Sequence, residues 1–268
     1  MTESPQIVGV ALLRDEDRVA AWSLGNVAAF CDRLIVLDNG SRDRTREIVA
    51  RLAATRPGVE LHDVLDAHDT HRFVEPLAGR KVWVIGVDGD EIYDRDGLAR
   101  LRARLLAGDY DRWWRLYGHT LHLTGGDLAA GVGRGYASPA SRSITKLYNF
   151  AAVDSWRQGR HERLHGKDMA FRPGWSAESA LRLDAEGPWA EADFRCLHLC
   201  FLPRSSRAEA AAPARRNPVE ARSAAKPLKG LERRLRRLVG LPAERRPNYK
   251  RAHYAAGAVA EAALDGFG

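Results

Sequence analysis

The feature that most constrains this chain is the alternation of short apolar runs with helical patterns in its first part. The apolar runs have the length of β-strands and cover residues 6–13 (QIVGVALL), 33–37 (RLIVL), 59–62 and 81–87 (KVWVIGV). A helical spacing of apolar residues covers 20–28, and another ends before Pro57-Gly58. Strands that alternate with helices form mostly parallel sheets with both faces covered, so we expect an α/β fold.

The second half of the chain is less regular. Further strands are expected within 112–123, over 144–150 and over 194–201. The glycine-rich segment 124–138 is expected to be a mobile loop.

A linker rich in Ala, Arg and Pro follows Pro203 and leads to helical patterns around 228–241 and 252–264. We therefore expect one domain over 1–203, with halves 1–95 and 96–203. Residues 204–268 are expected to form a basic, largely helical C-terminal extension.

The positive charge of the chain is concentrated in this extension. The chain has 268 residues and a formal net charge of +7. From Phe201 onward it contains fifteen Lys or Arg and six Asp or Glu, so the preceding part is nearly neutral. A nucleic-acid-binding body would carry basic patches itself, so no nucleic-acid partner is expected.

Several features predict a cytoplasmic protein. The sequence MTESPQ lacks the basic and apolar regions of a secretion signal, and the apolar runs are too short to cross a bilayer. The cysteines at 31, 196 and 200 are sparse and odd in number, which argues against a disulfide framework.

The motif Asp88-Gly89-Asp90-Glu91 directly follows the apolar run 81–87. Carboxylates held this close repel one another, and a divalent cation such as Mn²⁺ or Mg²⁺ relieves the repulsion and bridges to substrate phosphates. A solvated acidic turn is the plainer interpretation. An aspartyl-nucleophile phosphatase also places Asp-x-Asp after an apolar strand, but no Thr follows Asp90 here.

Two other acidic residues, Asp15 and Asp38, also come just after apolar runs. Ligands of parallel α/β sheets bind at the carboxyl ends of the strands. We therefore expect Asp15, Asp38 and Asp88 to converge on one crevice.

Three segments occur in a fixed order: Arg14-Asp15-Glu16, then 34–45 (LIVLDNGSRDRT), then 82–91 (VWVIGVDGDE). This series resembles glycosyltransferase family 2, which has a charged segment, a D-(D/N/T)-G-S-x-D-x-T segment and a W-hydrophobic-D-x-D-E segment after successive strands. The resemblance covers about residues 6–95. It implies a GT-A fold, which is Rossmann-like, and a nucleotide-diphosphate sugar donor of the UDP, GDP or dTDP type.

The resemblance also implies roles for individual residues. Asp38 would contact the base or ribose, and Asp15 or Glu16 would line the same nucleotide pocket. Asp88 would lie near the ribose and the metal, and Asp90 would be the main metal ligand.

In the second half the resemblance is looser, and it implies an inverting reaction. Such a reaction needs a base for the acceptor hydroxyl, and Glu162 is the predicted base, with Asp154, Glu191 and Asp193 as rivals. A surface ion pair is the alternative for Glu162. His198, on a late apolar strand, would complete the metal shell or be a buried, hydrogen-bonded histidine.

Residues 226–241 combine a leucine stripe at helical spacing with many Lys and Arg. Such a helix lies on an anionic membrane, near a lipid-linked acceptor, or packs on the domain with its basic face solvated. The predicted function is metal-dependent transfer of a sugar to a glycan, lipid-linked or natural-product hydroxyl, as in bacterial cell-surface or natural-product glycan biosynthesis. The non-enzymatic alternative is a membrane-associated protein that keeps the fold without turnover.

Overall fold

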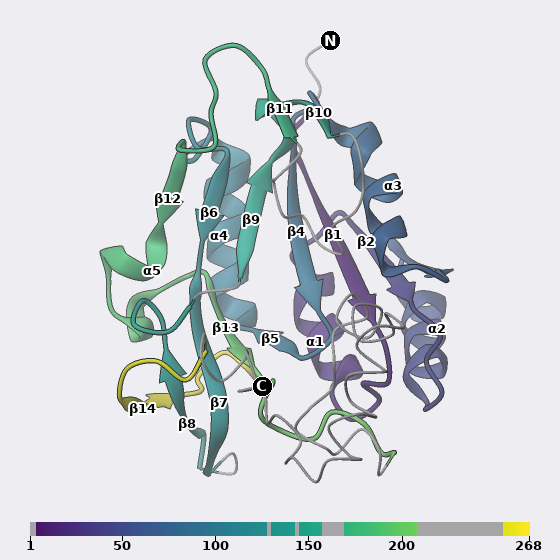
Figure 1. Cartoon of the computed structure of the whole chain (residues 1–268), viewed down its shortest axis with the longest axis vertical. Coiled ribbons are helices and arrows are strands. Elements are labelled where there is room, and N and C mark those ends of the chain that lie inside the picture. The colour runs from purple at the N-terminus through teal and green to yellow at the C-terminus, as the bar shows by residue number, and fades with distance from the viewer. Residues whose placement is uncertain (1–3, 128–129, 143–144, 157–168, 208–253) are drawn as a thin grey trace, which may run out of the picture.

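The computed structural model describes residues 4–127, 130–142, 145–156, 169–207 and 254–268. Figure 1 shows a large central sheet with helices beside it and a second sheet below it. The first strand, β1 (Gln6–Leu13), belongs to the large sheet, and the last described strand, β14 (Val259–Ala263), belongs to the second.

The main sheet contains the four predicted N-terminal strands in parallel. These are β1 (Gln6–Leu13), β2 (Arg33–Asp38), β3 (Val59–Asp63) and β4 (Val82–Asp88). β1 pairs with both β2 and β4, and β3 continues the sheet beyond β2. Beyond β4 the sheet is extended by β9 (Lys146–Asn149), β6 (Arg115–Tyr117) and β12 (Ala180–Arg182), of which β9 runs antiparallel to both its neighbours.

Both faces of this sheet are covered. Successive side chains of each strand point to opposite faces, and each face packs against a different set of elements. Ile7 and Ala11 of β1 pack with α1 (Ala20–Ala28), α2 (Thr45–Thr55) and α4 (Arg95–Ala107). Val8 and Val10 pack on the other face, which is covered by short elements. These are α3 (His71–Val74), η2 (Glu75–Leu77), η3 (Phe150–Ala152), β10 (Val153–Trp156) and β11 (Met169–Phe171), with η1 (Ala67–Thr70) just before α3. The predicted α/β fold with a mostly parallel central sheet and flanking helices is confirmed.

The second sheet has the order β14-β8-β7-β13-β5. Its strands are β5 (Glu91–Tyr93), β7 (His119–Asp127), β8 (Val132–Ala137), β13 (Arg195–His198) and β14 (Val259–Ala263). Two short helical elements, α5 (Leu183–Glu186) and η4 (Trp189–Glu191), precede β13. β5 follows β4 after a two-residue turn, so the two sheets meet at the motif 88–91.

The prediction of a mobile loop over 124–138 is wrong for the described residues, since β7 and β8 form an antiparallel hairpin there. The glycines serve close packing between strands. A Cβ atom at Gly126 would lie 2.3 Å from the carbonyl oxygen of Val132, and one at Gly135 would lie 2.2 Å from that of His122.

The helix expected around 252–264 is also wrong where the structure describes this segment. Residues Val259–Ala263 form β14, which pairs antiparallel with β8. Alternate side chains of β14 are exposed and half-buried, which is the burial pattern of an edge strand and not of a helix. The helix expected at 228–241 lies outside the described residues.

Among the residues that the structure describes, no helix has the length and apolar character needed to cross a membrane.

Candidate functional site

The carboxyl ends of the central parallel strands bring the predicted acidic residues together. Asp38 ends β2 and is in register with Leu13, the last residue of β1, while Asp88 ends β4 and is in register with Leu12. Asp15 comes two residues after β1. The strands that flank β1 therefore present Asp38 and Asp88 on either side of the segment that carries Asp15.

The loop after β1 is fixed to the loop after β2 by hydrogen bonds. The Asp15 amide donates to Ser41 Oγ at 3.1 Å, and the Arg42 amide donates to Asp15 Oδ1 at 2.6 Å. The Glu16 amide donates to Thr45 Oγ1 at 2.7 Å. Asp15 has a φ of 52°, a left-handed conformation that is uncommon outside glycine and is held here by these bonds.

Asp38 is buried and only partly satisfied. Its Oδ2 atom accepts a hydrogen bond from the Ser41 amide at 3.0 Å. Its Oδ1 atom is buried and has no hydrogen-bond partner among the described residues. A buried carboxylate oxygen without a partner is costly, so this atom is suited to accept a hydrogen bond from a ligand.

The turn between β4 and β5 places Asp90 against the loop after β1. A Cβ atom at Gly89 would lie 1.8 Å from Glu16 Oε2 and 3.0 Å from Leu13 Cγ. The absence of a side chain at Gly89 therefore lets the Glu16 carboxylate approach the motif. Asp90 itself is 2% exposed.

Glu91 has a structural place in this motif. Its Oε2 atom accepts hydrogen bonds from the Asp88 amide at 3.1 Å and the Tyr93 hydroxyl at 2.8 Å. Burial, with the negative charges of Asp88 and Asp90, raises the pKa of Glu91 to about 8. Glu91 thus shapes the turn from inside the protein.

His198 lies beside the motif because β13 pairs antiparallel with β5, which puts His198 in register with Glu91. The Leu199 amide donates to the Asp90 carbonyl oxygen at 2.8 Å and holds the two segments together. The Nε2 atom of His198 is 3.5 Å from Oδ2 of Asp90, and both side chains are 3% exposed.

Arg204 brings a positive charge into the acidic cluster. Its Nη1 atom donates to Glu16 Oε1 at 3.2 Å and also contacts Asp90 Oδ2. Burial alone would lower the pKa of this guanidinium, but the carboxylates of Asp90, Glu16 and Asp88 raise it. In this structure, a cation supplied by the chain itself thus neutralises Asp90 and Glu16.

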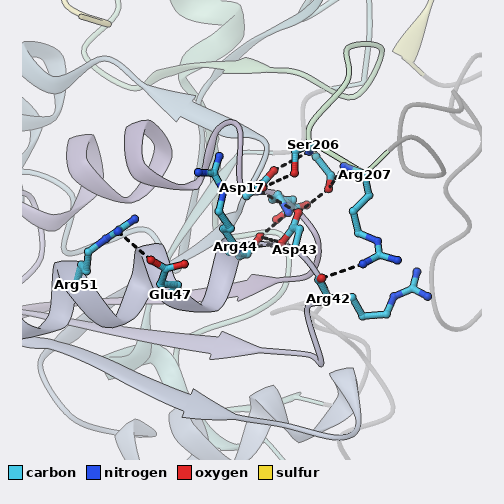
Figure 2. Close-up of polar contacts among 11 residues, drawn as sticks. Asp17, Arg42, Asp43, Arg44, Glu47, Arg51, Ser206 and Arg207 are labelled. Carbon is cyan, nitrogen blue, oxygen red and sulfur yellow. Dashed lines mark hydrogen bonds and ion pairs between the residues drawn. The ribbon is translucent and has the colours of Figure 1, made fainter.

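Arg204 belongs to residues 204–207, which we call the strap because they bind across the loops after β1 and β2. Ser205 Oγ donates to Asp43 Oδ2 at 2.5 Å. The Ser206 amide and hydroxyl donate to the two carboxylate oxygens of Asp17 at 2.7 and 2.6 Å. Figure 2 shows Ser206 meeting Asp17 while the Arg207 side chain reaches back to the Arg42 carbonyl oxygen, to which it donates at 2.9 Å.

The residues around Asp90 fit a hard divalent cation. Carboxylate oxygen is the ligand that Mg²⁺ and Mn²⁺ prefer, and an imidazole nitrogen beside it is compatible with Mn²⁺. The Nε2 atom of His198 and the Oδ2 atom of Asp90 face each other. Asp88 precedes Asp90 by two residues in the same motif. His122, His198 and Cys200 also have potential ligand atoms within 4.8 Å of one another.

The predicted base cannot be placed, because Glu162 lies outside the described residues. Of its rivals, Asp154 and Glu191 are exposed, and Asp193 accepts a hydrogen bond from Arg100 Nε at 2.7 Å. The assignment of the base therefore stays a prediction.

Sequence reasoning missed two residues of the site. Arg204 is one of many basic residues near the C-terminus, and nothing in its local sequence distinguishes it. His122 lies between Leu121 and Leu123 on β7, in register with His198 on β13. A histidine between apolar residues of a strand can indicate a functional residue. Only the strand register, which puts it beside His198, shows what this one contacts.

No protein-family model and no curated protein sequence matches this chain. Several solved glycosyltransferase structures are similar to it. TarS from S. aureus (residues 1–349) is 14% identical, with 55% of this chain and 48% of that chain covered and a TM-score of 0.38. Glucosyl-3-phosphoglycerate synthase from Mycobacterium tuberculosis is 17% identical, with 56% and 58% covered and a TM-score of 0.38.

The mannosyltransferase PcManGT from Pyrobaculum calidifontis, in complex with GDP-Man and Mn²⁺, is 18% identical, with 55% of this chain and 45% of that chain covered and a TM-score of 0.35. The match thus spans about half the length of each of these structures.

Proposed function

We propose that this protein is a divalent-cation-dependent glycosyltransferase that uses a nucleotide-diphosphate sugar. The observation that carries the proposal is the buried pair of Asp90 and His198, whose Oδ2 and Nε2 atoms are 3.5 Å apart beside the carboxylate of Glu16. Such a concentration of carboxylates in a buried place is unfavourable unless positive charge compensates it. In this structure Arg204 supplies this compensation, and a divalent cation that also binds a diphosphate would add to it and couple it to substrate binding.

The nucleoside of the donor is assigned to the ends of β1 and β2. The buried Oδ1 atom of Asp38 accepts no hydrogen bond within the described structure, which supports a hydrogen bond to it from the base or ribose. Asp15 or Glu16 would line the same nucleotide pocket, and Asp88 would lie near the ribose and the cation. The diphosphate would then lie next to Asp90.

Asp90, His198 and Asp88 are the residues that would hold the cation. When bound, it would offset the negative charge that develops on the leaving diphosphate. Arg204 contacts Asp90 in this structure, so its guanidinium would also lie close enough to offset charge on the diphosphate.

The acceptor is proposed to be a hydroxyl of a glycan, a lipid-linked molecule or a natural product. Inversion at the anomeric carbon requires a base on the acceptor side, for which Glu162 remains the candidate. Contact of residues 226–241 with a membrane surface is a separate proposal. It rests on the sequence pattern alone.

The first test of the function is binding of Mn²⁺ and UDP or GDP to the full chain by titration calorimetry. We expect Asp90→Asn, which keeps the shape of the side chain and removes its charge, to weaken Mn²⁺-dependent nucleotide binding by at least about tenfold, the loss of one charge-assisted contact.

The matched control is Asp109→Asn. Asp109 is an exposed acidic residue that is paired with Arg104 after α4, outside the cluster. Equal nucleotide binding by wild type and Asp90→Asn in the presence of Mn²⁺ would contradict the proposed function.

A further inference from the structure

Two buried histidines on neighbouring strands of the second sheet form a direct contact. His122 and His198 are in register on the parallel strands β7 and β13, and they are 0% and 3% exposed. Their Nδ1 atoms are 2.8 Å apart. The other ring nitrogen of His122, Nε2, is 2.8 Å from the backbone carbonyl oxygen of Arg142.

These contacts determine where the hydrogens lie. A carbonyl oxygen only accepts hydrogen bonds, so His122 Nε2 must carry the hydrogen that it donates to Arg142. His122 is fully buried, and in the described structure its ring contacts a carbonyl oxygen, a second imidazole and the ring of Tyr254. Burial without a contacting carboxylate favours the neutral ring, whose single hydrogen is the one on Nε2, so Nδ1 is an acceptor. The hydrogen between the two Nδ1 atoms must therefore belong to His198.

With its single ring hydrogen on Nδ1, His198 has an unprotonated Nε2 atom. That atom is the one 3.5 Å from Asp90 Oδ2. A nitrogen lone pair and a carboxylate oxygen then face each other with no hydrogen between them, which is an arrangement that attracts a cation. In this structure the guanidinium of Arg204 contacts the same oxygen. The opposite tautomer would instead donate a hydrogen bond to Asp90 and block the nitrogen.

We propose that His122 is a positioning residue that fixes the tautomer of His198, so that Nε2 of His198 is presented to a divalent cation next to Asp90. The part of this inference that concerns the cation rests on the proposed function, whereas the tautomer assignment does not. Hydrogen bonding of the second nitrogen of a metal-binding histidine is a general way to orient the ring and raise its basicity.

The surroundings of His122 keep it in place. The ring of Tyr254 stacks on His122 with centroids 4.5 Å apart and meets His198 edge-on at 5.3 Å. Strand β8 passes close behind, since a Cβ atom at Gly135 would lie 2.2 Å from the carbonyl oxygen of His122. The pair therefore has little freedom to exchange hydrogen-bond partners.

The test is long-range ¹H–¹⁵N NMR of the histidine rings in the full chain, in the presence of EDTA so that no metal contributes. In wild type we expect His198 to carry its hydrogen on Nδ1. In His122→Phe, which keeps an aromatic ring against Tyr254 but has no acceptor, we expect His198 to shift to the Nε2–H form. In His122→Asn, whose side-chain oxygen is able to accept the Nδ1–H bond, the wild-type tautomer should be retained.

A second readout is Mn²⁺ affinity by calorimetry. We expect a loss of roughly 10- to 100-fold in His122→Phe, the usual cost of removing an outer partner of a metal-binding histidine, and a smaller loss in His122→Asn. A hydrogen on Nε2 of His198 in wild type would overturn the inference, whether or not any variant folds. The Nδ1–H form in a wild-type protein that does not bind Mn²⁺ would uphold the tautomer but contradict the proposed function.

Discussion

At the scale of single residues, the site is defined by how its carboxylates are satisfied. The Asp15 carboxylate accepts a hydrogen bond from the Arg42 amide, and the amides of Asp15 and Glu16 donate to the hydroxyls of Ser41 and Thr45. Asp90 and Glu16 share the charge of Arg204. The Oδ1 atom of Asp38, next to these groups, is buried and has no hydrogen-bond partner in the described part of the chain. We therefore assign ligand recognition, rather than fold stability, to Asp38.

This assignment predicts the behaviour of Asp38→Asn. The substitution keeps the shape and removes the charge, so nucleotide binding in the presence of Mn²⁺ should weaken by about 10- to 100-fold, the loss of one hydrogen bond to a charged group. Mn²⁺ binding without nucleotide should change little. Calorimetry with Mn²⁺ alone and with Mn²⁺ plus UDP or GDP separates the two effects.

The control for this variant is Asp63→Asn. Asp63 is in register with Asp38 on the next strand but is exposed and paired with Arg46 at 2.7 Å. Surface pairs of this kind contribute little, so we expect wild-type nucleotide binding. A loss in Asp63→Asn as large as that in Asp38→Asn would argue against a specific role for Asp38.

The sequence predicted the positions of these carboxylates because they follow directly from apolar strands whose ends meet at one edge. It did not predict Arg204 or His122. The role of Arg204 depends on a segment far along the chain that reaches Glu16, and the role of His122 depends on the pairing of β7 with β13. Long-range contacts of this kind leave no periodic pattern in a single sequence.

At the scale of elements, the strap connects the C-terminal part of the chain to the nucleotide-side loops. The Arg18 amide donates to the Arg204 carbonyl oxygen at 3.1 Å, and both oxygens of Asp17 are bound by Ser206. Burial alone would raise the pKa of Asp17. The hydrogen bonds from Ser206, together with Arg44, outweigh this effect and lower the pKa. The strap is therefore a docked segment, and it sets Arg204 in the place where positive charge is needed.

Arg204→Gln tests whether the guanidinium and a divalent cation compensate the same carboxylates. Without metal, the loss of a buried ion-pair partner should lower stability, by on the order of 3 kcal/mol. Because Mn²⁺ then replaces the missing charge, it should raise the Tm of Arg204→Gln more than that of wild type. Thermal unfolding with EDTA and with Mn²⁺ measures both effects.

Arg207→Gln is the control within the same strap, because its side chain is exposed and binds only a backbone carbonyl oxygen in the described structure. It should respond to Mn²⁺ as wild type does. An equal Mn²⁺ effect in Arg204→Gln and wild type would show that the two cations do not share a site.

Element prediction succeeded where a strand is apolar on both faces and failed where glycine or alanine dominates. The bounds of β1, β2 and β4 agree with the predicted runs to within one residue because buried parallel strands have few polar interruptions. The hairpin of β7 and β8 was missed because glycine was interpreted as mobility, while here it permits close backbone approach. β14 was missed because alanine favours helix in isolation and pairing with β8 decides otherwise.

At the scale of the whole molecule, the site lies where the two sheets meet. β4 of the main sheet continues through the motif into β5 of the second sheet, and β13 brings His198 beside it. The last described residues reinforce this junction. The Arg195 guanidinium binds Asp94 at 2.7 Å and the Asp265 carbonyl oxygen at 2.9 Å, and Phe267 is buried. Residues 254–268 therefore pack against the domain that was predicted to end at 203.

In the proposed function, the main sheet binds the donor and its junction with the second sheet binds the cation. Both should then be needed together for tight binding of a nucleotide diphosphate. This coupling is the central claim, and it does not depend on knowing the acceptor or the sugar.

The most direct test is thermal unfolding of the full chain with UDP, GDP, dTDP and their sugars, each with Mn²⁺ and with EDTA. A ligand at 100 times its Kd stabilises the folded state by about 2.7 kcal/mol. For a chain of this size that corresponds to a rise in Tm of about 5 to 10 °C. We predict such a rise for at least one nucleotide with Mn²⁺ and its loss with EDTA. No shift with any nucleotide, or an equal shift in EDTA, would contradict a cation-dependent nucleotide-sugar site.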